Sequence, residues 1–242
     1  MLTPPEIARS LLAAGESKAR LPFGKMLLLA ILAGAYIALA GVGATAAAVT
    51  VESGSLAKLL SACVFPAGLS MVILAGSELF TGNCLMVMAL LERRITPAQL
   101  LRNWLTVYLG NAVGGAAVAA LAVYSHTASL FGDGLARSMV SIAESKAALG
   151  AGDAFLRGVL CNFLVCLAVW MAAASKRAEG KVIALFFPIL LFVLCGYEHC
   201  IANLYYLPAG AFAAAEYGVE TTLTLAGCLE NLAAVTLGNL VG

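Results

Sequence analysis

Two glutamates stand inside long apolar stretches of this sequence, where an unpaired carboxylate is expensive. Glu78 follows a glycine by two positions, as does Glu198, and an asparagine comes five positions after each glutamate. A carboxylate in hydrocarbon costs several kcal/mol unless it finds partners. A glycine at membrane depth permits a helix break, whose freed backbone groups then need polar partners. We therefore interpret four residues as supports for two helix breaks, in preference to a role as proton carriers: Glu78, Asn83, Glu198 and Asn203.

A histidine next to the second glutamate has no polar counterpart beside the first. His199 lies deep in its apolar stretch, and an imidazole changes its charge near neutral pH. Burial favours the neutral ring and a nearby anion favours the charged one, which suits a site for small monovalent anions and their conjugate acids. One alternative is a histidine that satisfies backbone groups at the break. We expect no metal with Cys195 and Cys200, because no further ligand-type side chains cluster there.

The composition places most of the molecular surface in contact with lipid. Of the 242 residues, 62% are hydrophobic and 11% are charged, and the mean hydropathy is +0.97. A soluble domain carries about 25% charged residues. The net charge of +1 argues against a nucleic-acid partner, which needs a basic face. All seven cysteines lie in apolar stretches, where a reduced thiol acts as a small hydrophobe.

Six apolar segments predict an all-α membrane protein with six spans. The first, 26–51, carries no charge across its apolar core and can cross about 30 Å of hydrocarbon. The others are 59–91, 103–126, 155–175, 182–215 and 221–242. The second and fifth are too long for one simple helix and contain the two glutamates. Residues 1–25 are amphipathic and predict a helix along the membrane surface.

Basic residues predict the orientation of the spans. Ten of the fourteen Lys and Arg precede the first span or lie in the loops after the second and fourth spans. The positive-inside rule places these segments and both termini in the cytoplasm. We expect a multi-pass protein of a bacterial cytoplasmic (inner) membrane.

The sequence also contains an internal repeat. Residues 102–111 match residues 230–239 at five positions with an offset of 128, and residues 77–83 share their Glu and Asn with residues 197–203. Halves of three spans cross the membrane in opposite senses, as in many transporters and channels. We predict one transmembrane domain over 1–242, with repeats at about 26–126 and 155–242. The same offset would carry the last span beyond residue 242, so a truncated final helix is expected.

Several of these segments resemble motifs of the formate/nitrite transporter family. They are Ser77-Glu-Leu-Phe-Thr-Gly-Asn83, Asn103-Trp with Gly110-Asn111, Cys161-Asn-Phe-Leu-Val-Cys-Leu-Ala-Val-Trp170, Gly196-Tyr-Glu-His-Cys-Ile-Ala-Asn203 and Val235-Thr-Leu-Gly-Asn239. The resemblance implies an aquaporin-like protomer with the second and fifth helices broken, assembled as a homopentamer with one pore per protomer. It implies transport of formate, nitrite or hydrosulfide, with no cofactor and no enzymatic chemistry.

The resemblance also implies roles for individual residues. The family's central histidine falls on His199 and its loop threonine on Thr81, and a vestibule lysine falls on Lys146. Apolar constrictions would strip water from an ion. The outer one would be Phe65 with Leu69, and the inner one Leu79 with Phe192. The remaining pore residues would be Asn162, Asn239 and Val165.

Other functions fit the sequence less well. A neutral-solute channel of the aquaporin kind would carry Asn-Pro-Ala at each break, but the breaks read Phe-Thr-Gly-Asn83 and Cys-Ile-Ala-Asn203. A membrane-embedded enzyme would need further catalytic or metal-binding groups at depth, and a structural protein leaves His199 unexplained. Within the family, formate is favoured over nitrite and hydrosulfide by Asn83 after Thr-Gly.

Overall fold

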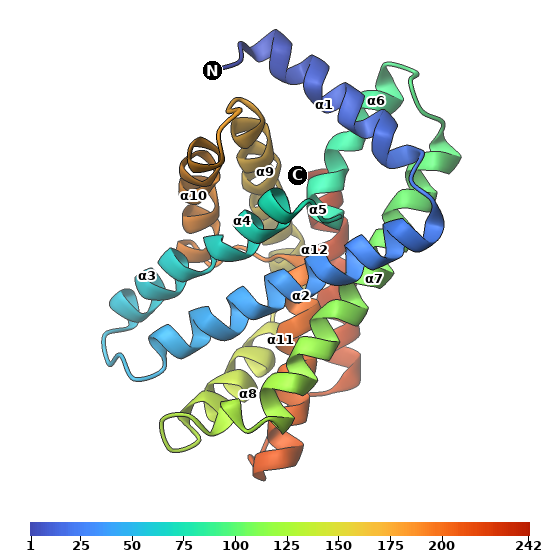
Figure 1. Cartoon of the computed structure of the whole chain (residues 1–242). Coiled ribbons are helices and arrows are strands. Elements are labelled where there is room, and N and C mark those ends of the chain that lie inside the picture. The colour runs from blue at the N-terminus through green and yellow to red at the C-terminus, as the bar shows by residue number, and fades with distance from the viewer.

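The computed structural model describes all of residues 1–242, and every regular element in it is helical (Figure 1). The elements are α1 (Pro4–Ala19), α2 (Phe23–Ala48), α3 (Gly54–Val64), α4 (Pro66–Ala75), α5 (Phe80–Asn83), a 3-10 turn (Cys84–Met86), α6 (Val87–Leu91), α7 (Pro97–Tyr124), a second 3-10 turn (Thr127–Ser129), α8 (Gly134–Ala147), α9 (Ala151–Ala173), α10 (Ala178–Leu194), α11 (Cys200–Tyr217) and α12 (Leu225–Val241).

The second apolar segment breaks where the sequence predicts it. Helix α4 ends at Gly76, whose φ of 78° lies in the left-handed region that glycine adopts without a steric penalty. The chain is extended at Leu79, and helical structure resumes at Phe80 and continues to Leu91. The break is therefore only a few residues long and brings the start of a new helix into the interior.

The fifth apolar segment breaks in the same way. Helix α10 ends in front of Gly196, whose φ is 69°. His199 is extended and serves as the N-cap of α11. Both predicted interruptions are thus present, each with a left-handed glycine at the end of the first half-helix.

Each half contains one closely packed pair of helices. Helix α2 lies against α7, and α9 lies against α12 (Figure 1). A Cβ atom on Gly114 of α7 would collide with the carbonyl oxygen of Ile31, and one on Gly238 of α12 with that of Phe155. Small residues at these contacts let the backbones approach, as is common in membrane helix pairs.

Four of the helical segments are long and apolar enough to cross a bilayer: Phe23–Ala48, Gly54–Ala75, Pro97–Tyr124 and Ala151–Ala173. Their outward faces expose large aliphatic side chains such as Leu105, Leu109 and Leu121. An apolar exterior of this kind fits contact with lipid or with other helices rather than with water.

Two amphipathic helices lie at opposite ends of the fold. Helix α1 forms within the first 25 residues, as predicted, with Pro4 at its first position, and it crosses one end (Figure 1). Helix α8 lies at the other end, between α7 and α9 in the sequence. Each of them sends one lysine toward a helix break.

Candidate functional site

An asparagine from α7 holds the first break. The side-chain oxygen of Asn111 accepts from the backbone N–H of Phe80 at 3.0 Å. Its amide nitrogen donates to the carbonyl oxygens of Ala30 at 2.7 Å and Glu78 at 2.9 Å. Unpaired backbone groups at this depth would each cost about 1–3 kcal/mol, so one side chain stabilises both sides of the break.

An asparagine from α12 holds the second break with the same three bonds. Asn239 accepts from the N–H of Cys200 at 2.9 Å and donates to the carbonyl oxygens of Gly158 and Glu198 at 2.8 and 2.9 Å. It is fully buried, and both N–H groups of its amide are paired with backbone carbonyls. Asn239, expected on the pore side, thus binds backbone groups on both sides of the break.

The glutamates at the breaks bind lysines rather than freed backbone groups. Lys18 Nζ of α1 donates to Glu78 Oε1 at 2.8 Å and to Asn83 Oδ1 at 2.9 Å. Lys146 Nζ of α8 donates to both carboxylate oxygens of Glu198 at 2.9 Å. The predicted support of the breaks by Glu78 and Glu198 is thus indirect, because each carboxylate ties an amphipathic helix to the end of a break.

The asparagines that follow the breaks complete two matching networks. Asn83 donates to Glu78 Oε2 at 2.8 Å and to Asn103 Oδ1 at 2.9 Å. In the second half Asn203 donates to Glu198 Oε2 at 2.7 Å and to Asn231 Oδ1 at 2.8 Å. The asparagines therefore orient the carboxylates, and the repeat extends to individual hydrogen bonds.

The two breaks meet at Thr81 and His199. Thr81 Oγ1 lies 2.9 Å from His199 Nε2, and both residues are buried. His199 Nδ1 accepts from the backbone N–H of Ala202 at 3.1 Å, so Nδ1 carries no proton in this geometry. The proton of the neutral ring then sits on Nε2 and is donated to Thr81 Oγ1. The Thr81 hydroxyl proton is left available for a further acceptor.

The four predicted constriction residues lie in the core and are divided between two cavities. The rings of Phe65 and Phe192 are 5.6 Å apart and nearly perpendicular, and the His199 ring stacks on Phe192 at 5.8 Å. Leu69 and Leu79 line a different cavity from these aromatic residues. The rotation of α4 and α10 thus brings Phe65 against Phe192, while Leu69 and Leu79 both line the second cavity.

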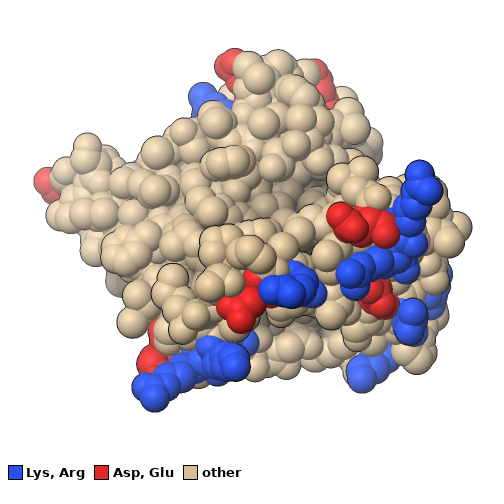
Figure 2. All heavy atoms as spheres, turned by 90° about the horizontal axis from the view of Figure 1, so that it is seen from above, with Lys and Arg blue, Asp and Glu red and all other residues tan.

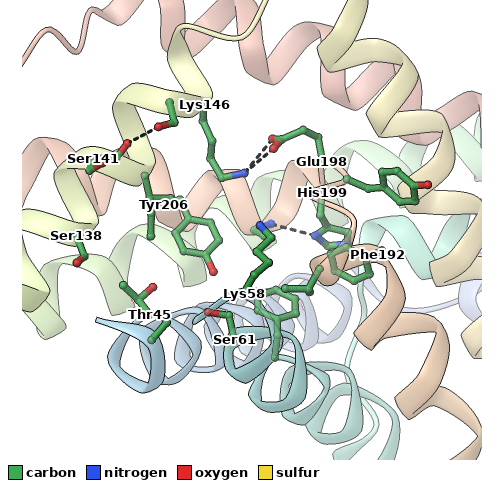
Figure 3. Close-up of a pocket in the computed structure, with 18 of the residues that line it drawn as sticks. Thr45, Lys58, Ser61, Ser138, Ser141, Lys146, Phe192, Glu198, His199 and Tyr206 are labelled. Carbon is green, nitrogen blue, oxygen red and sulfur yellow. Dashed lines mark hydrogen bonds and ion pairs between the residues drawn. The ribbon is translucent and has the colours of Figure 1, made fainter. Parts of the chain in front are cut away.

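Two cavities lead toward the breaks from opposite ends. The first, of about 500 Å³, is lined by Lys146, Phe65, Phe192 and His199, and we term it the Lys146 cavity (Figure 3). The second, of about 290 Å³, is lined by Lys18, Leu69 and Leu79, and we term it the Lys18 cavity. The Thr81–His199 contact lies buried between them. Two water-accessible chambers separated by apolar side chains are the parts that a selective channel requires.

The two remaining predicted pore residues lie one turn apart on α9. Asn162 donates to the carbonyl oxygen of Asn239 at 2.6 Å, and its own side-chain oxygen is buried without a partner. Val165 is buried in the main core. Its neighbour Cys166 donates to the carbonyl oxygen of Thr81 at 3.7 Å, so this face of α9 packs against α5.

Sequence reasoning missed Lys18 and Asn111. A signal for Lys18 was present, because Glu16-Ser-Lys-Ala19 of α1 is identical to Glu144-Ser-Lys-Ala147 of α8 at the repeat offset of 128. The duplication therefore includes the amphipathic helices. Asn111 belongs to the recognised repeat, but its role depends on carbonyl groups of α2 that only the tertiary structure brings near.

Comparison with known proteins gives one consistent result. The sequence model of the formate/nitrite transporter family matches residues 5–242. A protein of Methanothermobacter thermautotrophicus described as a probable formate transporter is 39% identical over 259 residues, which cover 99% of this chain and 92% of that protein. The formate channel FocA of Haemophilus influenzae is 39% identical over 228 residues, covering 88% of this chain and 80% of that one.

Solved structures agree with the sequence comparison. A structure described as an FNT family ion channel has a TM-score of 0.87 and 32% identity, and the match covers 98% of this chain and 94% of that one. A second, described as a pentameric formate channel with formate bound, has a TM-score of 0.81 and 32% identity, with 91% and 92% covered. These relatives are channels and transporters, not enzymes. Their identity and coverage, together with the whole-chain family match, show that this chain belongs to the formate/nitrite transporter family.

Proposed function

We propose that this protein is a membrane channel for small monovalent anions of weak acids, with formate as its main substrate and nitrite or hydrosulfide as the alternatives. The observation that carries the proposal is the Thr81–His199 hydrogen bond at 2.9 Å between two cavities. Formate is named in the descriptions of relatives that match 88–99% of this chain. The donors in the middle are few and neutral, which suits an ion that can become a neutral acid.

Passage in this proposal is linked to protonation of the anion beside Thr81 and His199. The apolar pairs Phe65–Phe192 and Leu69–Leu79 make dehydration of an anion costly. Between them, the anion accepts a hydrogen bond from Thr81, whose hydroxyl is polarised by His199 Nε2–H. The N-terminus of α11 adds positive potential at the same place. One proton from solvent then joins the anion to give the neutral acid, which crosses the next constriction. His199 orients and polarises Thr81 and stays neutral.

We further propose six spans in an aquaporin-like arrangement. The single spans would be α2, α7, α9 and α12, and the broken spans would be α3–α6 and α10–α11. The support is the matching set of clamps around Asn111 and Asn239, which relates the two halves bond by bond. Midplane breaks and inverted halves are the arrangement that many transporters build from such a repeat, and this similarity supports the proposal.

The face that carries α1 is proposed to be cytoplasmic, with both termini on that side of a bacterial inner membrane. Figure 2 shows Lys and Arg side chains gathered on this face, with acidic groups among them and wide uncharged areas around them. This distribution follows the positive-inside rule. The Lys146 cavity is then the outer vestibule and the Lys18 cavity the inner one. A homopentamer with one pore per protomer is proposed from the formate channel of the same fold.

Reconstitution tests the function directly. Purified protein in liposomes is expected to take up ¹³C-formate faster than empty liposomes, and nitrite and hydrosulfide should be compared as competitors. If neutral solutes of similar size are taken up as fast as formate, the aquaporin-like alternative is favoured. Absence of flux for all three anions would overturn the proposal.

A further inference from the structure

The two cavities of this protein differ in charge although the repeat relates them. In the Lys18 cavity one cation, Lys18, faces one carboxylate, Glu78. In the Lys146 cavity three cations face one carboxylate: Lys58, Lys146 and Arg157 with Glu198. The larger cavity therefore carries an excess of positive charge that the smaller one lacks.

Lys146 is not the source of this excess. Its ammonium group contacts both oxygens of Glu198 at 2.9 Å, and its side chain is only 15% exposed. It also lies over the Tyr206 ring at 5.3 Å. At the other end Lys18 is paired with Glu78 through one carboxylate oxygen, at 2.8 Å, and also bonds Asn83. A cation held against a carboxylate in this way has little potential left for a mobile anion, so the attraction expected from Lys146 alone is offset.

Lys58 and Arg157 provide the uncompensated charge. Neither side chain forms an ion pair with a carboxylate of this chain. Lys58 lines the same cavity as Arg157, Lys146 and Glu198, and its Nζ lies 3.9 Å from the position that a Cβ atom on Gly196 would take. Figure 3 shows Lys58 and Lys146 pointing into the same space in front of His199 and Phe192.

The repeat explains why only one cavity has these charges. The position of Arg157 is occupied in the first half by Leu29, whose carbonyl oxygen accepts from Glu78 N just as that of Arg157 accepts from Glu198 N. Lys58 corresponds to Ala178 in the second half, at the offset of 120 that aligns Glu78 with Glu198. The backbone of the two halves is thus matched, while the two cationic side chains belong to one half alone.

We propose that Lys58 and Arg157 form an anion-binding subsite in the Lys146 cavity, which holds a small monovalent carboxylate or inorganic anion before it reaches Phe65 and Phe192. The Lys146–Glu198 pair supports the wall of this subsite and does not supply its charge. Serines on successive turns of α8, Ser138, Ser141 and Ser145, line the same cavity and offer neutral hydrogen bonds to a partly hydrated anion. The subsite makes the protein asymmetric, because anions concentrate at this mouth and not at the other.

The inference rests on the proposed function for its role in transport, but binding can be measured without transport. The probe is ¹³C-formate, whose line broadening on titration with the detergent-solubilised protein gives a dissociation constant. The double variant K58Q/R157Q is expected to weaken binding about three- to tenfold at low ionic strength. The difference should disappear at about 1 M salt, where the Debye length is near 3 Å. Lys58→Arg keeps the charge and should bind like the parent.

Arg137→Gln is the matched control. Arg137 lies at the same end of the protein, on α8, but its guanidinium bonds to the carbonyl oxygen of Gly132 and lines an adjoining pocket that does not include Lys58 or Arg157. Its loss should leave formate binding unchanged. In liposomes, K58Q/R157Q should raise the half-saturating formate concentration and keep the maximal flux. Thermal unfolding midpoints close to that of the parent would show that the variants fold.

The outcomes separate the subsite from the proposed function. Equal binding by parent and K58Q/R157Q, or equal weakening by Arg137→Gln, would overturn the subsite. A parent that binds formate through Lys58 and Arg157 but shows no flux would support the subsite and overturn the transport proposal. A lowered maximal flux at unchanged half-saturation would place Lys58 and Arg157 in the constriction and contradict their role in the cavity.

Discussion

His199 Nε2 lies 2.9 Å from Thr81 Oγ1, although the two residues are 118 positions apart in the sequence. The bond joins the first turn of one half-helix to the N-cap of the other. Because Ala202 N–H donates to Nδ1, a doubly protonated ring would set two donors against each other. The structure therefore favours a neutral His199 that donates to Thr81 Oγ1. The Thr81 hydroxyl proton then remains available for an acceptor such as a passing anion.

Removal of either group should change the pH profile of flux. We expect Thr81→Val and His199→Phe to reduce formate uptake by about tenfold or more near pH 8, since a lost hydrogen bond to an anion costs about 1.5–3 kcal/mol. Near pH 5 the reduction should be smaller, because more formic acid is already present in solution. Stopped-flow uptake into liposomes between about pH 5 and 8 measures this.

The two variants also separate the roles of the groups. Thr81→Val keeps the His199 cap on Ala202 N, whereas His199→Phe also removes that cap and should destabilise the protein by about 1 kcal/mol. A His199→Phe profile that coincides with the parent's across this pH range would show that the proposed link between proton and anion is wrong.

The perpendicular contact between Phe65 and Phe192 predicts a second effect. Phe192→Ala opens the cavity wall beside His199 and removes its stacking partner. We expect larger monocarboxylates such as acetate and lactate to gain flux relative to formate, because water then reaches the site and dehydration costs less. Competition uptake with labelled formate gives the ratio. Ile183→Ala, on an exposed face of the same helix, is the control and should keep the parent's selectivity. An unchanged ratio in Phe192→Ala would exclude this aromatic pair as a constriction.

Sequence reasoning found the breaks because their signals are local. Gly76 and Gly196 end helices because each adopts a left-handed backbone conformation. Two positions after each glycine stands a glutamate, which is costly in an apolar segment unless it has a partner. The pairing of Phe65 with Phe192 depends on how α4 and α10 are rotated, which hydropathy does not specify because these helices are apolar on every side. The roles of Asn111 and Asn239 depend on carbonyl groups of helices about 80 positions away, and no pattern within one segment contains that information.

The Lys18–Glu78 pair allows a double-mutant cycle that isolates its coupling. Lys18→Met leaves Glu78 buried with one donor fewer and should destabilise the protein by about 1–3 kcal/mol. Glu78→Gln should cost a similar amount, and K18M/E78Q less than the two together, since no unpaired charge remains. Thermal unfolding in detergent measures each midpoint. The same cycle can be measured for Lys146 and Glu198 in the second half. If the stability losses of the single variants add up fully in both double variants, the pairs do not stabilise the fold.

The clamps give the strongest prediction for stability. Asn239→Ala removes three hydrogen bonds at once and leaves the N–H of Cys200 and the carbonyl oxygen of Glu198 without this partner, whereas Gly158 lies inside α9 and its carbonyl keeps the helical bond. At about 1–3 kcal/mol for each of the two groups at the break, the loss is expected to be about 2–6 kcal/mol. Asn111→Ala should cost about the same, because its three bonds match in kind and length.

Thr236→Ala, one turn from Asn239 and bonded only to Tyr108, serves as the control and should lower stability by about 1 kcal/mol. Equal midpoints for Asn239→Ala and Thr236→Ala would show that the break at Gly196 holds without its clamp. Where Asn239→Ala is too unstable to purify, Asn239→Asp keeps the acceptor for Cys200 N–H and, when its carboxyl is protonated, has one O–H donor in place of the two amide N–H groups. Its stability should then fall between that of Asn239→Ala and that of the parent, at a pH where the new carboxyl is protonated.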